Sequence, residues 1–291
     1  MERTLKDIFV VPPISVLDVK QGYWKTRRKY WLESGIESEL GRNENLLSLS
    51  PLLKKKQKST SIFDPVLCEI MYKWFSETGD LVFDPFCGGS VRGIVASKCD
   101  RDYIGIDIRE EQLDANRTQT KSMCDTHLPI YYHIDKKEMK EYDFFFTCPP
   151  YFNLEKYSNR EDDLSNMTEE QFWIEYEKII KESLSYLKDG RFAAIVVGDV
   201  RRKDGSYLLL PHRTIDIFQK YGLTFYNDLV LLQEPATAAM RAFNYMNSSR
   251  KIAKAHQNVL VFVKGDINLA SSRLSKFSDD SVEESSIEKW C

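Results

Sequence analysis

Short apolar runs alternate with helix-like segments between residues 61 and 265, and this alternation constrains the fold more than any other feature. Segment 65–77 shows the helical kind, because apolar residues recur at helical spacing after Asp64 as a cap and Pro65 at the first helical position. Strands that alternate with helices form right-handed βαβ units, so the pattern predicts an α/β fold with a mostly parallel sheet. The predicted strands are 81–83, 103–107, 130–134, 142–147, 192–198, 225–232 and 258–263, and the other helices are 91–98, 109–122, 168–187 and 214–221.

The two ends of the chain differ from this central part in charge. Residues 20–58 contain ten Lys or Arg and four Glu, whereas residues 266–291 contain six acidic and three basic residues. We expect a basic, irregular arm over 1–60 with one helix at 20–32, a catalytic domain over 61–265, and a disordered acidic tail over 266–291. A basic arm of this kind fits contact with a polyanion.

Several protein classes do not fit the sequence. No run approaches the ~18 apolar residues of a transmembrane helix, and charged residues lie where a signal peptide needs an apolar run. The six cysteines form no CxxC pair and have no histidines at ligand spacing, which disfavours a zinc site or a disulfide framework. We expect a soluble cytoplasmic protein without a metal or a membrane partner.

The first candidate site is the turn after the 81–83 strand, Asp84-Pro85-Phe86-Cys87-Gly88-Gly89-Ser90. Its two glycines lack side chains, so the backbone there can pass close to a ligand where the next helix begins. The spacing is neither GxGxxG nor GxxxxGK(S/T), which disfavours a dinucleotide or a triphosphate. Asp84 is expected to meet a positive group.

Two further acids follow the next two predicted strands. Asp107 ends a strand about twenty residues beyond the glycines, where a carboxylate can accept hydrogen bonds from ribose hydroxyls. Asp135 follows the third strand, where nucleoside-binding folds contact the adenine ring. Taken alone, each acid also fits a helix cap or an exposed surface position. Their order at successive strand ends favours a nucleoside-containing cofactor.

The second candidate site is the turn Cys148-Pro149-Pro150-Tyr151 after the 142–147 strand. The two prolines stiffen the turn and leave carbonyl oxygens without a strand partner, so a planar amine could donate one hydrogen bond to the Pro149 carbonyl and another to the side chain of residue 148. Tyr151 could then lie against the ring that carries the amine. Such a site fits the exocyclic amino group of a base turned out of its duplex. By itself, the motif equally fits a rigid loop with a packed tyrosine.

Together these motifs resemble the S-adenosylmethionine-dependent amino-methyltransferases of DNA, the N4-cytosine and N6-adenine methylases, particularly the single-chain enzymes of bacteriophages and mobile elements. The resemblance extends over roughly residues 10–265. The segments that carry it are 12–18, 21–24, 61–69, 84–90, Asp107, 148–151, 198–201 and 254–258.

The resemblance implies a Rossmann-like class I methyltransferase fold, with a mostly parallel seven-stranded sheet and an antiparallel terminal hairpin. It implies that the amino nitrogen of a base turned out of double-stranded DNA attacks the sulfonium methyl group directly, at the turn formed by Cys148, Pro149, Pro150 and Tyr151. It also implies S-adenosylmethionine as cofactor, with the methionine end near Phe63 and further contacts from Asp84, Phe86, Gly88, Gly89, Asp107 and Asp135.

Cys148 departs from the family pattern, in which Asp, Asn or Ser precedes Pro-Pro-Tyr. A thiol accepts hydrogen bonds poorly. Three explanations stay open: the Pro149 carbonyl does most of the work, Thr147 or Asp199 assists, or the enzyme is weak. A covalent role for Cys148 is disfavoured, because the cytosine-C5 enzymes place their cysteine after the proline. Cysteine is nearest to serine in shape, which slightly favours the cytosine-N4 branch.

Cations interleaved with aromatic residues are typical of surfaces that contact a nucleic-acid backbone. The predicted DNA contacts are Lys25, Arg27 and Arg28 in the 20–32 helix, Arg201 after the 192–198 strand, and Arg241 and Lys254 in a long loop over 234–254. The helix also fits a solvated element whose aromatic residues pack on the core. His256 fits either a phosphate or base contact or a structural role.

The leading hypothesis is therefore a DNA methyltransferase that acts on adenine N6 or cytosine N4, with a separate endonuclease as a possible partner. An RNA base amino-methyltransferase would use the same chemistry, although such enzymes usually carry an added RNA-binding module. A degenerate methylase that keeps the fold to hold DNA is the third possibility, because of Cys148.

Overall fold

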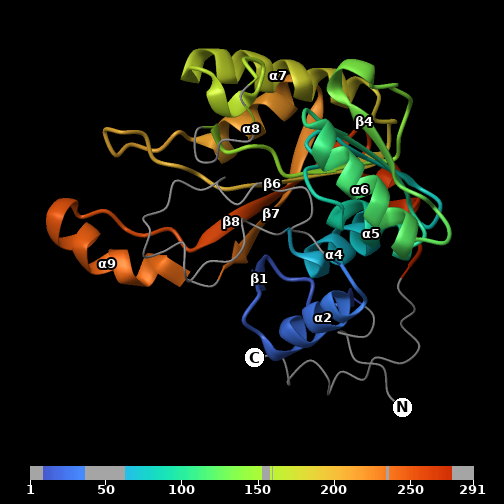
Figure 1. Ribbon diagram of the computed structural model, residues 1–291, viewed down its shortest axis with the longest axis horizontal. Helices are drawn as coiled ribbons and strands as arrows, with labels where there is room; N and C mark the ends of the chain where they lie inside the picture. Colours follow the sequence, from blue (N-terminus) through green and yellow to red (C-terminus); the bar gives the residue numbers. More distant parts are fainter. Residues whose placement is uncertain (1–8, 37–62, 153–157, 159, 234–235, 277–291) are drawn as a thin grey trace.

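The computed structural model describes residues 9–36, 63–152, 158, 160–233 and 236–276. Eight strands form one sheet in the order β1-β7-β8-β6-β5-β2-β3-β4 (Figure 1). The strands are β1 Val16–Asp18, β2 Leu81–Asp84, β3 Asp102–Asp107, β4 Ile130–His133, β5 Phe144–Thr147, β6 Arg191–Val197, β7 Leu223–Leu232 and β8 His256–Lys264. The helices are α2 Gly22–Glu33, α4 Pro65–Phe75, α5 Val91–Lys98, α6 Glu110–Met123, α7 Glu169–Ser185, α8 Leu210–Lys220, α9 Ala236–Ser249 and α10 Ile267–Ser272.

The strand directions confirm the predicted Rossmann-like arrangement. Within the sheet, each neighbouring pair in the run β6-β5-β2-β3-β4 is parallel, whereas β8 runs antiparallel to both β6 and β7. The sheet has eight strands rather than seven, because β1 pairs in parallel with β7, with Val16 opposite Val230. A three-residue strand that depends on a partner over 200 residues away has no local pattern, so the prediction of an irregular arm was wrong at β1.

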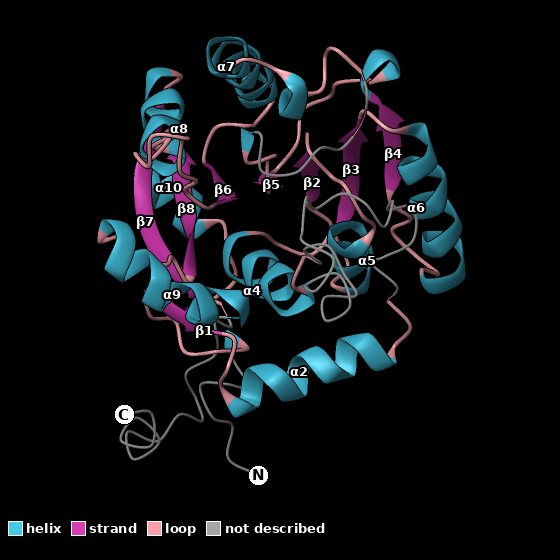
Figure 2. Cartoon of the chain, turned by 60° about the vertical axis from the view of Figure 1, so that its left-hand side comes forward, coloured by secondary structure: helices cyan, strands magenta, loops and turns pink. Residues whose placement is uncertain are grey.

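Helices cover both faces of the sheet, and successive residues of one strand reach opposite layers. In β5, the side chains of Phe144 and Phe146 join the core under α4, α5 and α6, while Phe145 joins the core under α7 and α8. Figure 2 shows α7 on one side of the sheet and α4 and α5 on the other. A central strand buried on both faces is apolar throughout, which explains the unbroken apolar runs of the sequence.

Local signals in the sequence set the ends of two helices. Asp64 accepts a hydrogen bond from the Val66 amide 2.9 Å away and caps α4, with Pro65 at its start. Thr168 and Gln171 form the predicted capping box of α7, in which each side chain bonds the backbone amide of the other residue.

Helix α2 confirms the predicted 20–32 helix and packs on α4. Trp24 and Trp31 are buried, and the buried carboxylate of Glu69 on α4 accepts hydrogen bonds from Arg27 and from the Trp31 indole. Lys73 lies 2.9 Å from the same carboxylate. Burial alone would raise the pKa of Glu69, but the hydrogen bonds from Arg27 and Lys73 outweigh burial and lower it. Helix α2 is therefore fastened to the domain by its own cations and aromatic residues.

Two segments differ from their predicted form. Residues 266–276 are not disordered: α10 buries Ala270, and Arg273 pairs with Asp80, so tertiary contacts override the polar composition there. Within 234–254, predicted as a long loop, α9 begins with Ala, Met and Arg, which are good helix formers, and contains no Gly or Pro. Across the described part of the chain, none of the helices combines the length and apolarity needed to span a bilayer.

Replacing Arg27 with alanine should lower the free energy of unfolding by about 1–2 kcal/mol, since Glu69 loses its forked partner but 42% of the Arg27 side chain is exposed and screened by solvent. Because the pKa of Glu69 is below its ordinary 4.5 in the folded state, the stabilisation is present above pH 4.5 and is lost as pH falls through the folded pKa. Urea unfolding should therefore show a difference from the parent at pH 7 that shrinks on acidification. Lys25→Ala, on the exposed face of α2, is the control. Equal stabilities of both variants would contradict a stabilising role for the Arg27–Glu69 pair.

Candidate active site

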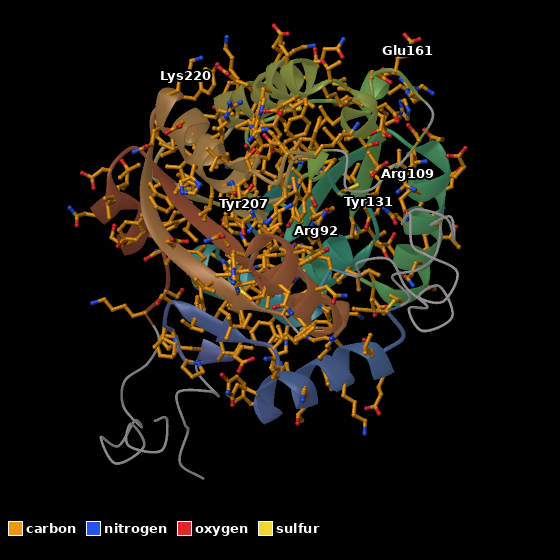
Figure 3. The ribbon with its side chains drawn as sticks, turned by 90° about the vertical axis from the view of Figure 1, so that its left-hand side faces the viewer. Arg92, Arg109, Tyr131, Glu161, Tyr207 and Lys220 are labelled. Carbon is orange, nitrogen blue, oxygen red and sulfur yellow. The ribbon has the colours of Figure 1, made fainter. Side chains whose placement is uncertain are left out.

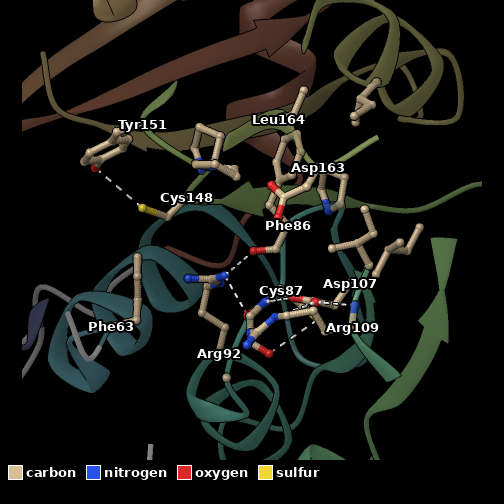
Figure 4. Close-up of a pocket in the computed structure, with 18 of the residues that line it drawn as sticks. Phe63, Phe86, Cys87, Arg92, Asp107, Arg109, Cys148, Tyr151, Asp163 and Leu164 are labelled. Carbon is tan, nitrogen blue, oxygen red and sulfur yellow. Dashed lines mark hydrogen bonds and ion pairs between the residues drawn. The ribbon is translucent and has the colours of Figure 1, made fainter. Parts of the chain in front are cut away.

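The two predicted turns meet at one cavity of about 350 Å³ at the carboxyl edge of the sheet (Figure 4). The parallel strands β2, β3 and β5 end there, which is where open α/β sheets bind ligands. Nine of the predicted site residues line it: Phe63, Phe86, Gly88, Gly89, Asp107, Cys148, Pro149, Pro150 and Tyr151.

The glycine turn is held against the end of β3. Gly88 adopts a left-handed conformation with φ of +49°, and its amide donates a hydrogen bond to Asp107 Oδ2 at 3.1 Å. The Gly88 carbonyl accepts one from Asn116 Nδ2 at 2.7 Å. A Cβ atom at Gly105 would lie 2.7 Å from the Cys87 side chain, so only glycine allows β3 this close to the turn.

Asp107 presents a carboxylate at the cavity wall, as predicted. Its Oδ1 accepts the Arg109 amide at 2.8 Å, and the Arg109 guanidinium lies 3.5 Å away. Burial raises the pKa of Asp107, and the Arg109 charge opposes that rise. A desolvated carboxylate already oriented by two backbone amides is suited to accept hydrogen bonds from ligand hydroxyls.

Asp84 does meet a positive group, but it does so beneath the turn rather than at the cavity. It is fully buried and accepts hydrogen bonds from Arg92 Nε at 2.5 Å, from the Tyr103 hydroxyl at 2.6 Å and from Thr147. Arg92 also donates to the carbonyls of residues 86 and 87, at 2.7 and 2.9 Å. Figure 3 places Arg92 in the interior, whereas Lys220 lies at the periphery. Asp84 therefore holds the turn in place instead of contacting a ligand.

Asp135 lies outside the cavity wall. After β4 the chain enters a short 3-10 helix, Ile134–Lys136, in which Ile134 lines the cavity and Asp135 faces solvent with 59% of its side chain exposed. Arg160 lies 3.4 Å from its carboxylate. The acids at the cavity wall in this region are Asp162 and Asp163, which a strand-end rule cannot find because they follow β5 at a distance in sequence.

The second turn places an aromatic ring and two amides together. Tyr151 packs against Gly198, where a Cβ atom would approach its ring to 3.1 Å. Its hydroxyl accepts a hydrogen bond from Gln257 Nε2 at 2.5 Å, and Gln257 Oε1 accepts one from Gln233 at 2.7 Å. Both glutamines line the cavity. Gln257 lies in the 254–258 motif, whereas no sequence motif marks Gln233.

The side chains proposed to assist Cys148 are already engaged elsewhere. Thr147 is fully buried and donates to Asp84, and Asp199 Oδ1 accepts the amides of Val200 at 3.0 Å and Leu210 at 3.2 Å. Neither residue lines the cavity, whereas Cys148 does, with its sulfur 3.6 Å from the Tyr151 hydroxyl. The Pro149 carbonyl and Cys148 itself remain as acceptors.

The predicted DNA contacts are dispersed over the surface. On α2, Arg27 pairs with Glu69 and Arg28 lies 3.9 Å from Asp64, while Lys25 is exposed. The alternative interpretation of this helix, with Trp24 and Trp31 packed on the core, is confirmed.

The remaining predicted contacts lie on the β6–α8 and β7–β8 connections. The exposed Arg201 stacks over Tyr207, with 4.0 Å from its guanidinium to the ring centre. Lys254 is half-buried, and desolvation lowers its pKa while Asp199 opposes this. Arg241 belongs to α9, and its side chain lies outside the described residues. His256 begins β8, and burial lowers its pKa.

Comparison with known proteins places this chain in a family. The family model for N6 and N4 methyltransferases, described as DNA methylase, matches residues 20–118 and 142–289. The chain belongs to this family. The orphan methyltransferase M.BamHII of Bacillus amyloliquefaciens is 32% identical over 95 residues, which cover 33% of this chain and 36% of that enzyme. The alignment thus spans about a third of the relative's length.

Solved methyltransferase structures resemble the chain more distantly. A methyltransferase from Pyrococcus furiosus is 14% identical with a TM-score of 0.48, over 83% of this chain and 98% of that one. Magnesium protoporphyrin IX methyltransferase from Synechocystis, with bound S-adenosylmethionine, is 12% identical with a TM-score of 0.48, over 83% and 96%.

S-adenosylmethionine is the cofactor of this methylase family, and the cavity fits it. The volume of about 350 Å³ is in the range of small-molecule sites. Phe63 and Phe86 supply apolar walls, and Asp107 supplies a desolvated acceptor for hydroxyl groups. In the described part of the chain, no three His, Cys, Asp or Glu side chains converge as metal ligands do.

Asp84→Ala should cost about 3–5 kcal/mol of stability, because it leaves the buried Arg92 charge without its partner. Asp135 was predicted as a cofactor contact like Asp84, but its side chain is exposed. Asp135→Ala should therefore leave stability unchanged. Urea denaturation followed by tryptophan fluorescence compares the two. Similar unfolding midpoints for both variants would refute the assignment of Asp84 to the scaffold.

Proposed function

We propose that this chain transfers a methyl group from S-adenosylmethionine to an exocyclic amino group of a base in duplex DNA, at adenine N6 or cytosine N4. The observation that carries the proposal is the convergence of the glycine turn and the Cys148–Tyr151 turn on one cavity (Figure 4). Membership of the DNA methylase family supports it.

The cofactor half of the cavity lies between the glycine turn and β3. Asp107 would accept hydrogen bonds from the ribose hydroxyls, and Gly88 and Gly89 would let the backbone approach the bound molecule. The Arg92 guanidinium lies over the Phe63 ring, with its carbon 4.4 Å from the ring centre, and Phe63 lines the cavity. We assign this position to the methionine end. The sulfonium supplies an activated methyl group.

The acceptor half holds the base. A base must leave its stack to reach this depth, and the Tyr151 ring, fixed between Gly198 and Gln257, provides a flat surface for it. The Pro149 carbonyl would accept a hydrogen bond from the amine and orient the nitrogen toward the methyl group. Bound S-adenosylmethionine would supply its methyl group to this nitrogen, and the amine would release one proton to solvent. Rate enhancement comes from holding nucleophile and methyl in line.

Cys148 bears on which groups would hold the amine. Because Thr147 and Asp199 are engaged elsewhere, the Pro149 carbonyl would be the main acceptor, with the thiol as a weak second.

Such an enzyme would work in the cytoplasm on cellular or phage DNA, and a separate endonuclease that cleaves the unmethylated sequence would be a matching partner. In this proposal residues 61–265 form the catalytic domain.

Incubation with tritiated S-adenosylmethionine and unmethylated duplex DNA should place the label in DNA, and nucleoside mass spectrometry should identify N6-methyladenine or N4-methylcytosine. Label in RNA alone would identify an RNA amino-methyltransferase instead. Label in neither, with DNA binding intact, would identify a degenerate methylase. Both results would sink the proposal.

Asp107 and Tyr151 should separate cofactor binding from methyl transfer. Asp107→Ala should reduce S-adenosylmethionine affinity at least tenfold in calorimetry, because two hydrogen bonds to a charged acceptor are lost. Tyr151→Ala should keep that affinity and lose transfer, whereas Tyr151→Phe, which keeps the ring, should retain most of it. Normal turnover of Tyr151→Ala would show that the base does not stack on this ring.

A further inference from the structure

The second half of α9 is exposed at every position. All seven residues from Phe243 to Ser249, and Arg250 directly after the helix, are solvent-exposed, including Phe243 at 75% and Met246 at 41%. Ile252, just beyond the helix, is 69% exposed. A helix of a folded domain ordinarily buries one face, because an isolated helix of this length is marginal in water. Large apolar side chains on such a helix indicate a surface that contacts a partner.

The charge of this segment selects the kind of partner. Residues 235–255 contain four cations and no acidic residue, although the whole chain has a net charge of −3. The Lys251 side chain lies against Gly205, so the segment adjoins the loop that carries Arg201. A polyanion fits this surface. A second copy of the same helix would bring like charges together.

The position of α9 connects this surface to the cavity. Helix α9 leaves the sheet after Gln233 and returns before Gln257, and these two side chains bond each other at the cavity wall beside Tyr151. Figure 1 shows α9 standing out from the body of the molecule. A base held in the cavity is still joined to its duplex, so the DNA must pass close to the rim from which α9 projects.

From these observations we infer that α9 enters the major groove beside the target base and reads the flanking sequence. This inference rests on the proposed function, because it takes the base in the cavity as the origin of the duplex. Asn244 and Asn247 lie three residues apart on one face, and asparagine pairs with adenine through two hydrogen bonds. Phe243 and Met246 form the adjacent apolar stripe, which suits thymine methyl groups. Arg250 and Lys251 contact phosphates. The major groove, about 12 Å wide, admits one helix.

Two double variants of the full chain test the inference. Asn244→Ala/Asn247→Ala should relax discrimination, so that methylation of a random duplex pool spreads to sequences used about tenfold less by the parent, with cofactor affinity unchanged. Arg250→Ala/Lys251→Ala should weaken binding of all duplexes alike and reduce the slope of log affinity against log salt by about 1 per lost contact. Lys121→Ala, in the last turn of α6, and Leu128→Ala, just before β4, are at exposed positions and serve as controls that should change neither quantity.

The outcomes separate this inference from the proposed function. If the parent methylates DNA and both α9 variants keep its sequence preference and salt slope, α9 is not the reading helix and the proposed function stands. If the parent transfers no label to DNA, the proposed function itself fails. If the α9 variants instead convert a dimer to a monomer in sedimentation, with DNA binding unchanged, α9 is an interface between copies and the inference is overturned.

Discussion

The buried ion pair between Asp84 and Arg92 is the interaction on which the rest of the site depends. A single carboxylate at the end of β2 receives hydrogen bonds from the helix after the turn, from Tyr103 on β3 and from Thr147 on β5. Burying a charge at this depth costs several kcal/mol unless it is paired and fully hydrogen-bonded, so these donors are required together. Because Thr147 directly precedes Cys148, the same carboxylate sets the distance between the glycine turn and the Cys148–Tyr151 turn.

This construction suits a reaction in which the protein mainly provides position. An in-line transfer needs the reacting atoms about 3–3.5 Å apart, and small displacements are costly. The glycine turn is bonded to Asp107 and Asn116, and the Tyr151 ring is held between Gly198 and Gln257. The glycine turn thus rests on buried and backbone-bonded groups, whereas the Tyr151 ring is held by a buried glycine and a half-buried glutamine. The surfaces proposed to contact DNA, on α9 and the loop that carries Arg201, lie outside the cavity.

Sequence reasoning succeeded where the signal is local. Apolar runs, capping residues and turn glycines act within a few positions, and they predicted the strands β2 to β8, the caps of α4 and α7, and nine residues of the cavity wall. It failed where the outcome depends on distant partners. The strand β1 exists only through pairing with β7, and Arg27 is turned from a predicted DNA contact into a structural one by Glu69, 42 residues away. Asp84 and Asp135 were both expected at the cavity, yet one lies beneath it and the other faces solvent.

The sequence by itself determined the order of glycines, acids and the Pro-Pro-Tyr turn along alternating strands and helices, and this order predicts a nucleoside cofactor and a planar amine. Only the tertiary structure decided which residues line one cavity. Parallel strands bring their carboxyl ends to one edge, so Gln233 and Gln257, from β7 and β8, come to lie beside a tyrosine that follows β5. Side-chain direction at a strand end depends on the next few backbone angles and on packing partners far away in the chain, which no local pattern records.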